Sequence, residues 1–201
     1  MPAEVDAVLL SHLHYDHLDV PSLKLLPGDV PVLAPAGAGA LLRRAGVKQV
    51  EELVPGDATE VGALRIEATP ADHHDRRRPF GVRATPLGFV VRGRTSIYFA
   101  GDTDVFPEMA DLAPVDAALL PVAGWGPKLG PGHMDAEQAA QAAALLRPAV
   151  AVPIHWGTLH PRGRRRGDWF HGPPHEFAAR VAEVAPDIEV QILEPGAELE
   201  L

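Results

Sequence analysis

A strand that runs directly into a cluster of histidines restricts this chain more than any other feature of its sequence. The apolar stretch Val5–Leu10 has the length and composition of a buried β-strand. It leads into Ser11-His12-Leu13-His14-Tyr15-Asp16-His17, which places three imidazoles and a carboxylate within six positions. A lone histidine is usually structural or lies on the surface, but this cluster at the end of a strand indicates a metal site.

The spacing inside the cluster predicts ligands for two neighbouring ions. His12 and His14 are two residues apart, and residues i and i+2 of an extended segment project to the same side. Both rings can therefore reach one ion. Asp16 and His17 continue past the strand into a turn, where they can face a second ion close by.

Further candidate ligands lie just after, or at the end of, other strand-like stretches. They are the pair His73 and His74, then Asp102, then His155. Taken singly, each has an ordinary alternative: a surface turn, a turn or helix N-cap aspartate, and a satisfied core histidine. Asp104 fits the turn or N-cap role better than Asp102 does. Because the chain has no cysteine, we expect any metal to be held by histidine nitrogen and carboxylate oxygen.

Composition narrows the class of protein and of partner. The 201 residues suffice for one domain, which we expect to span 1–201, and the formal net charge of −9 argues against a general nucleic-acid binder. No apolar run approaches the ~20 residues of a membrane span, so we expect a cytoplasmic protein with no transmembrane segment. Arginines form three runs, Arg43-Arg44, Arg76-Arg77-Arg78 and Arg164-Arg165-Arg166. Such runs usually lie in solvated loops. The second and third are close in sequence to candidate ligands, so binding of a small anionic substrate is the alternative for them.

Strands and helices alternate along the sequence, which predicts a layered α/β fold. Short stretches rich in Val and Ile and bounded by Gly or Pro predict strands. They are Val5–Leu10, Val30–Ala34, Val50–Val54, Thr59–Val61, Leu64–Thr69, Leu87–Val91, Ser96–Ala100, Ala117–Val122, Val150–Ile154 and Ile188–Leu193. The predicted helices are Leu18–Leu26, Ala38–Ala45, Asp135–Leu146 and Pro174–Val184. A capping box of Asp135 and Gln138 marks the start of the third helix.

These motifs, in this order, resemble the metallo-β-lactamase-fold hydrolase superfamily. The resemblance covers about residues 5–160 and rests on H-x-H-x-D-H, a single later histidine, Gly101-Asp102-Thr103 and His155-Trp156-Gly157-Thr158. It implies the superfamily's αββα sandwich. Within the superfamily, five segments are similar to the branch of N-acyl-phosphatidylethanolamine-hydrolysing phospholipase D and ascorbate-phosphate lactonases. These segments are 69–73, 88–91, 98–103, 119–127 and 152–158.

The resemblance also implies a role for each candidate ligand. His12, His14 and His73 would hold one ion, Asp16, His17 and His155 the other, and Asp102 would bridge the two. His73 is preferred to His74 because its spacing matches the family's T-P-A-x-H pattern, which leaves His74 as a pocket residue or a residue behind the ligands. The expected cofactor is a pair of divalent ions, Zn²⁺ first, with Mn²⁺ or Fe²⁺ as alternatives.

The leading hypothesis is a hydrolase in which hydroxide held by two metals cleaves a small ester, lactone or phosphodiester. Asp16 would orient the water and shuttle a proton, and His133, in a Gly/Pro-rich loop, is a candidate to act on the substrate. His160 and Trp125 are weaker pocket candidates, and His171 and His175 are expected on the surface. The alternatives are a non-catalytic metal-binding member of the fold and, less favoured by the acidic charge, a nuclease.

The first strands of the family's fold are expected to be missing, because only 11 residues precede His12. The sheet would then have an exposed apolar edge, which favours self-association. We therefore expect a homo-oligomer or an aggregation-prone chain.

Overall fold

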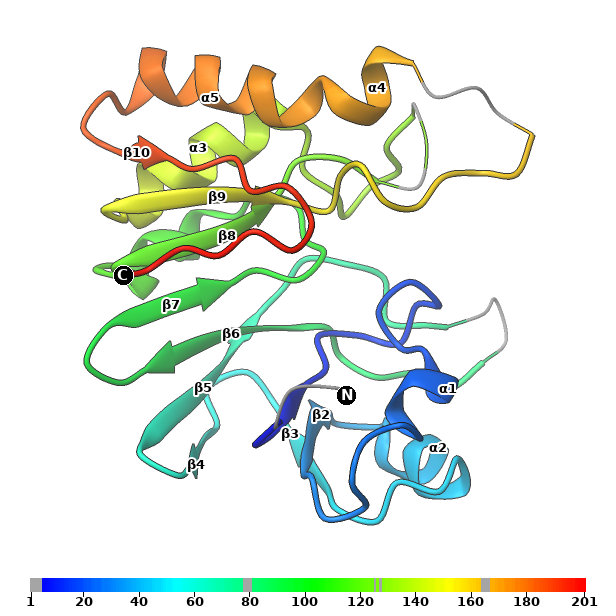
Figure 1. Ribbon diagram of the computed structural model, residues 1–201. Coiled ribbons are helices and arrows are strands. Elements are labelled where there is room, and N and C mark those ends of the chain that lie inside the picture. Colours follow the sequence, from blue (N-terminus) through cyan, green and yellow to red (C-terminus); the bar gives the residue numbers. More distant parts are fainter. Residues whose placement is uncertain (1–4, 78–80, 125, 127, 164–166) are drawn as a thin grey trace.

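Two β-sheets of different size make up the centre of the protein (Figure 1). The computed structural model describes residues 5–77, 81–124, 126, 128–163 and 167–201. The smaller sheet has the parallel order β1-β2-β3, with bounds Val8–Leu9, Val32–Pro35 and Val50–Leu53. The larger sheet has the order β10-β9-β8-β7-β6-β5-β4. Its strands, in chain order, are β4 (Ala58–Val61), β5 (Leu64–Pro70), β6 (Leu87–Arg92), β7 (Ser96–Phe99), β8 (Ala117–Pro121), β9 (Val150–Ile154) and β10 (Glu189–Val190).

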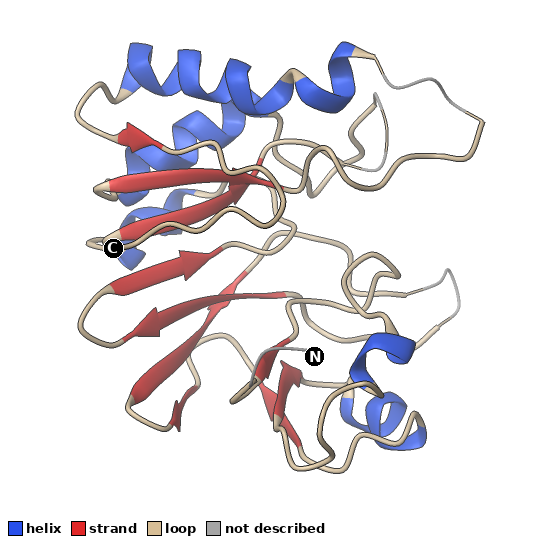
Figure 2. Ribbon diagram, in the orientation of Figure 1, coloured by secondary structure: helices blue, strands red, loops and turns tan. Residues whose placement is uncertain are grey.

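Helices lie on the outer faces of the two sheets (Figure 2). They are α1 (Val20–Leu23), α2 (Gly39–Arg44), the 3-10 helix η1 (Pro107–Leu112), α3 (Ala136–Leu146), α4 (Asp168–His171) and α5 (Pro173–Val184). The capping box predicted for α3 is present: the Gln138 backbone N–H donates to the Asp135 side chain, and the Gln138 side chain bonds back to the Asp135 backbone. Within the described part of the chain, no helix has the length and apolar character needed to cross a membrane.

Three buried clusters fill the spaces between the layers. Leu33 of the small sheet and Phe89 of the large sheet belong to the cluster between the sheets. Tyr98, on the other face of the large sheet, packs with α3 and with Phe177 of α5. Leu42 of α2 packs on the outer face of the small sheet. The layers therefore follow the order helix, sheet, sheet, helix, which confirms the predicted αββα sandwich.

Each predicted strand is present, although several are shorter than predicted. The first extends only over Val8–Leu9, and the last only over Glu189–Val190, because just these residues have a hydrogen-bonded partner strand. Two short helices were not predicted, η1 and α4. Both span six residues or fewer and begin without a side-chain cap, so the sequence offers little signal for either.

Strand ends from both sheets converge at one place. The strands β5, β7, β8 and β9 run in the same direction, so their C-terminal ends lie at the same end of the large sheet. In the register, Pro70 of β5 pairs with Leu87, and Phe99 of β7 pairs with Leu119. The Leu87 backbone N–H donates to the Ser11 carbonyl across 2.9 Å, which ties the end of β1 to the same end of this sheet. The loops after these strands therefore meet, although they are far apart in the sequence.

Candidate metal centre

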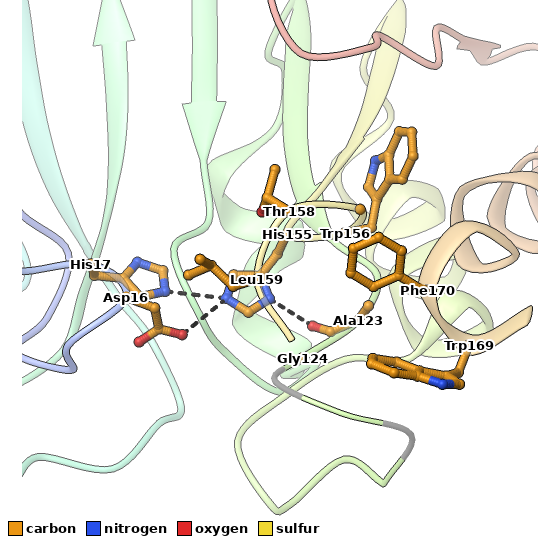
Figure 3. Close-up of a pocket in the computed structure, with 11 residues that line it drawn as sticks. Asp16, His17, Ala123, Gly124, His155, Trp156, Thr158, Leu159, Trp169 and Phe170 are labelled. Carbon is orange, nitrogen blue, oxygen red and sulfur yellow. Dashed lines mark hydrogen bonds and ion pairs between the residues drawn. The ribbon is translucent and has the colours of Figure 1, made fainter. Parts of the chain in front are cut away.

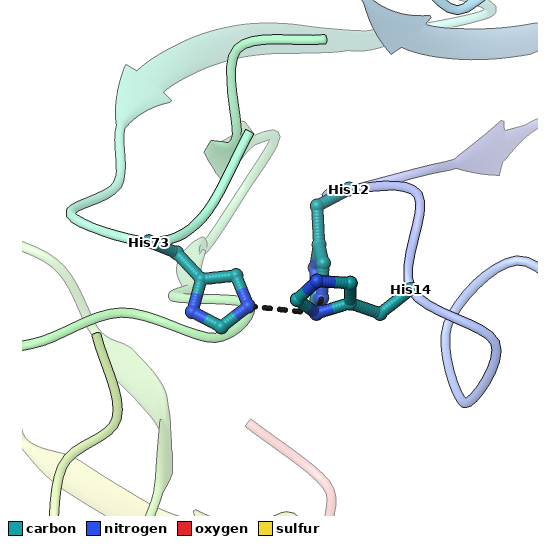
Figure 4. Close-up of side chains that lie close together, drawn as sticks. All are labelled: His12, His14 and His73. Atoms are coloured by element: carbon teal, nitrogen blue, oxygen red, sulfur yellow. Dashed lines mark hydrogen bonds between the residues drawn. The ribbon is translucent and has the colours of Figure 1, made fainter. Parts of the chain in front are cut away.

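Three imidazoles converge at the meeting point of the β1 and β5 loops (Figure 4). Nε2 of His12 lies 3.1 Å from Nδ1 of His14, and Nε2 of His73 lies 2.9 Å from the same atom. The side chains of His12 and His73 are buried, at 1% and 0% exposure. We call these three residues the first group.

A second group lies beside the first and consists of Asp16, His17, Asp102 and His155. Nε2 of His17 and Nε2 of His155 are 3.3 Å apart, and Nε2 of His155 is 3.7 Å from Oδ2 of Asp16 (Figure 3). His155 follows β9 with a φ of 63°, a region that few residues other than glycine adopt. Such backbone strain is typical of functional positions.

Asp102, three residues beyond the end of β7, is the member of the second group that lies next to the first. Its Oδ2 is 3.2 Å from Nε2 of His17, 3.8 Å from that of His12 and 4.0 Å from that of His73. Its Oδ1 is 3.4 Å from Nε2 of His155. One buried carboxylate thus reaches both groups.

The outward nitrogen of every histidine in the two groups has an acceptor. Nδ1 of His73 donates to the Gly132 carbonyl at 2.6 Å, and Nδ1 of His155 donates to the Ala123 carbonyl at 2.9 Å. The remaining three pairs are His14 Nε2 with the Arg76 carbonyl, His12 Nδ1 with Ser11 Oγ, and His17 Nδ1 with Ser11 Oγ. In its neutral form each ring places its proton outward and keeps a lone pair on the inward nitrogen, which is the arrangement of metal-binding histidines.

Burial keeps the first group uncharged. Burial, together with the neighbouring imidazoles, lowers the pKa of His12 to about 2 and that of His73 to about 4. Burial also lowers the pKa of His14 from its ordinary value. All three rings are therefore neutral at pH 7, which is the form that binds a metal.

Carboxylates give the second group a different charge state. Burial alone would lower the pKa of His155, but the adjacent Asp16 and Asp102 outweigh it and raise that pKa to about 9. Burial likewise opposes ionisation of Asp16, yet the hydrogen bond with His155 lowers its pKa to about 2. The pKa of Asp102 is also held below its ordinary range, because the hydrogen bond with His17 and the nearby imidazoles overcome burial.

The donor set fits a pair of divalent cations. Lone pairs of neutral imidazoles about 3 Å apart repel one another unless a cation lies between them, and imidazole and carboxylate are common ligands of Zn²⁺. Oδ1 of Asp102 is buried and has no hydrogen-bond partner among the described residues. Nε2 of His155 lies 3.4 Å from this oxygen without forming a hydrogen bond, and a metal ion would satisfy the buried carboxylate oxygen.

Two features that the sequence did not predict hold these loops in place. The guanidinium of Arg77 donates to the Leu13 carbonyl at 2.5 Å and to the Leu18 carbonyl at 3.1 Å, and it stacks over the Tyr15 ring at 3.9 Å. Gly132 has a φ of 78°, and a Cβ there would lie 2.9 Å from Nδ1 of His73. Both contacts join segments more than 55 positions apart, so no local sequence pattern could reveal them.

The remaining candidates have mixed outcomes. Nε2 of His133 lies 3.6 Å from Oδ2 of Asp102, and its side chain is 21% exposed. His74 is exposed, and its ring centroid is 5.9 Å from that of His73, so its expected place in the pocket or behind the ligands stays a prediction. The ring of His160 packs against Phe170. His171 and His175 are exposed, as predicted, and Trp125 lies outside the described residues. Asp104 is in an isolated β-bridge with Asp72, and its carboxylate accepts hydrogen bonds from Val105 and Gln138, so it occupies neither of the turn and N-cap roles expected for it.

In the described part of the chain, the side-chain contacts found for the arginines of these runs are with other protein groups and not with the two ligand groups. Arg77 is occupied by backbone carbonyls, and Arg76 forms an ion pair with Asp75 at 3.8 Å. Arg43 pairs with Glu52 in the small sheet. Residue 78 of the second run and the whole third run, 164–166, lie outside the described residues.

Comparison with known proteins places the chain in a family. Residues 1–156 match the family described as Beta-lactamase superfamily domain. A UPF0173 metal-dependent hydrolase of Methanopyrus kandleri is 35% identical over 99% of this chain and 84% of that protein. An uncharacterized protein of Mycobacterium tuberculosis is 37% identical over 81% of this chain, which spans only 48% of it. The structure of Igni18, a metallo hydrolase of Ignicoccus hospitalis, is 29% identical with a TM-score of 0.74, covering 96% of this chain and 78% of that one.

These similarities agree with the family expected from the histidine motifs. The narrower likeness to the phospholipase D and lactonase branch is not tested by them and stays a prediction. The assignment rests on the fold, on the family match over residues 1–156 and on the 35% identity to the Methanopyrus kandleri hydrolase. The chain belongs to the beta-lactamase superfamily and is a metal-dependent hydrolase of the metallo-β-lactamase fold.

Proposed function

We propose that this hydrolase uses two divalent metal ions, with Zn²⁺ as the first choice, to cleave a small ester, lactone or phosphodiester. The observation that carries the proposal is the pair of ligand groups that share Asp102. His12, His14 and His73 would hold one ion, and Asp16, His17 and His155 the other. When bound, two such ions ionise a water at neutral pH and polarise the scissile bond.

The chain's own residues would position that water and move its protons. Asp16 is partly exposed, at 17%, and its Oδ2 faces His155, so it would orient the attacking water and pass on the proton that the water loses. His133 lies at the open side of Asp102, and its Nδ1 donates to the Gly130 carbonyl at 3.2 Å. Its Nε2 therefore faces the site, where it would contact the substrate and support the leaving oxygen.

Metal content and turnover together test the proposal. The protein is freed of metal by chelation, reloaded with Zn²⁺ or Mn²⁺, and analysed for bound metal before assays on neutral esters, lactones and phosphodiesters. We expect about two ions per chain and hydrolysis that His14→Ala and Asp102→Ala abolish. Full metal loading without turnover of any substrate class would contradict the catalytic role. Failure to bind metal in a folded protein would contradict the whole assignment of ligands.

A further inference from the structure

A small cavity opens beside the second group, and one wall of it is aromatic (Figure 3). Asp16, His17 and His155 form the polar side of the cavity. The opposite side includes Trp156, Leu159, Trp169 and Phe170. Figure 3 places Trp156, Trp169 and Phe170 on the side of His155 that lies away from His17.

The aromatic wall is firmly packed and exposes little that is polar. Phe170 is only 2% exposed, and the rings of His160 and His171 pack against it, with centroids 5.5 and 4.7 Å away. The indole N–H of Trp156 donates to the Pro153 carbonyl at 2.9 Å, so its polar atom is already satisfied. A group that enters the cavity therefore meets ring faces and aliphatic carbon on this side.

The charge of the cavity points away from an anionic substrate group. Among the described residues that line it, the titratable side chains are Asp16, His17 and His155, and none is lysine or arginine. Arg77 is occupied elsewhere, since its guanidinium donates to the carbonyls of Leu13 and Leu18. On the described walls a phosphate or carboxylate would find no lysine or arginine, and the inward nitrogen of His155 is expected to be taken by the metal, whereas a neutral apolar group would be desolvated favourably.

The size of the cavity limits that group. Its volume is about 100 Å³, well below the ~300–1,000 Å³ of sites for drug-sized ligands. We infer that the substrate is a neutral ester or lactone that carries one small apolar group, such as a single ring or a short branched chain, seated against Trp156, Trp169 and Phe170. This inference rests on the proposed function and names its substrate class. Water adds to the carbonyl carbon, the acyl C–O bond breaks, and the leaving oxygen takes the proton, giving an acid and an alcohol.

Two ester series test the inference in the metal-loaded protein. Methyl acetate, methyl isobutyrate and methyl benzoate vary the acyl side, while ethyl acetate and benzyl acetate vary the alcohol side. Each kcat/KM is divided by the rate constant for hydroxide-catalysed hydrolysis of the same ester, which removes intrinsic reactivity. In one of the two series, we expect the ring-bearing or branched ester to exceed the smallest one by roughly tenfold or more. Diethyl phosphate should be a poorer substrate than any of them.

Variants connect the preference to the wall. Trp169→Ala and Leu159→Ser should reduce that ratio toward one, because both remove apolar area from the cavity. The matched control is Leu64→Ser, an equally apolar and exposed position on β5, 43% exposed, which should leave the ratio unchanged. A ratio that Trp169→Ala leaves intact in a protein with native circular dichroism overturns the inference.

A binding measurement separates this inference from the catalytic proposal. Quenching of tryptophan fluorescence is titrated with benzyl methyl ether, which cannot be hydrolysed, and with diethyl phosphate. Saturable binding of the ether that Trp169→Ala weakens supports the cavity assignment even if no ester is turned over. Ester hydrolysis without size preference, combined with no ether binding, overturns the inference and leaves the proposed hydrolysis standing. Tighter binding of diethyl phosphate than of the ether also overturns it.

Discussion

The two ligand groups are adjacent but chemically unlike each other. The first consists of three imidazoles that burial keeps neutral, and His12 and His73 are almost completely shielded from solvent. The second contains carboxylates, holds an additional proton on His155 and borders the open cavity. One half of the site is thus a closed set of neutral donors, and the other half is charged and accessible.

This difference assigns different work to the two halves. A metal ion that enters the first group displaces no proton, since the inward nitrogens already have lone pairs. An ion that enters the second group must replace the proton shared by His155 and its carboxylate partners. The cavity opens beside the second half, where we expect the substrate to approach. We therefore expect the first group to bind and hold metal more tightly, and the second to govern catalysis.

The largest expected effect comes from Asp102→Asn, which alters the side chain common to both halves. The amide keeps the shape but loses a charge that both groups share, so metal binding should fall at both positions. The loss of kcat/KM should exceed the roughly 10–100-fold typical of removing a partner behind a ligand. Elemental analysis and ester hydrolysis measure the two effects. Asp104→Asn, in the same loop but bonded to Val105 and Gln138, is the matched control.

Removing one ligand from each half should separate the two positions. His73→Ala should cost the ion of the first group, and His155→Ala that of the second, so each variant should retain about one ion per chain. His74→Ala is the natural control, because this neighbour of His73 is exposed. If either variant loses both ions completely, the two halves are a single cooperative unit and the comparison fails.

A smaller effect is expected from the arginine that holds the first loop. Arg77→Ala removes the donors to the carbonyls of Leu13 and Leu18 and the stacking on Tyr15. Because the loop carries ligands of both groups, metal affinity should weaken by roughly 10–100-fold while the fold persists. Competition with a chromophoric chelator measures that affinity. Arg83→Ala, an arginine that is 66% exposed and pairs with Asp75, should leave it unchanged.

The sequence was sufficient to predict the candidate metal ligands, but not the contacts that hold their loops in place. His12 and His14 were recognisable from their spacing after a strand, and Asp102 and His155 from their positions at strand ends. The layered fold followed from alternating strands and helices. In each case, the information lies within a few neighbouring residues.

What the sequence could not supply is contact between distant segments. Arg77 reads as part of a solvated basic run, yet its guanidinium is a donor to a loop about 60 positions away. Gly132 reads as an ordinary loop glycine, although His73 leaves no space there for a Cβ. The aromatic wall includes Phe170 of α4, a helix too short to give a periodic signal. Tertiary packing alone decides these roles.

The smallest expected effect is the number of protons released when metal binds. This number directly tests the difference in charge between the first and second groups. In the metal-free protein the pKa of His155 is raised to about 9, while those of His12 and His73 are lowered to about 2 and 4. At pH 7.5, therefore, only the second group has a proton to lose, and metal loading should release about one proton per chain from the side chains, in addition to the proton lost by the metal-bound water. Affinity should rise as pH increases and level off above about pH 9, where His155 is already neutral. Calorimetry in two buffers of different ionisation enthalpy measures the release, and His155→Gln should lower it by about one proton per chain. Release that is undiminished in His155→Gln would mean that the side-chain proton comes from another group, and the contrast between a neutral and a charged half would have to be abandoned.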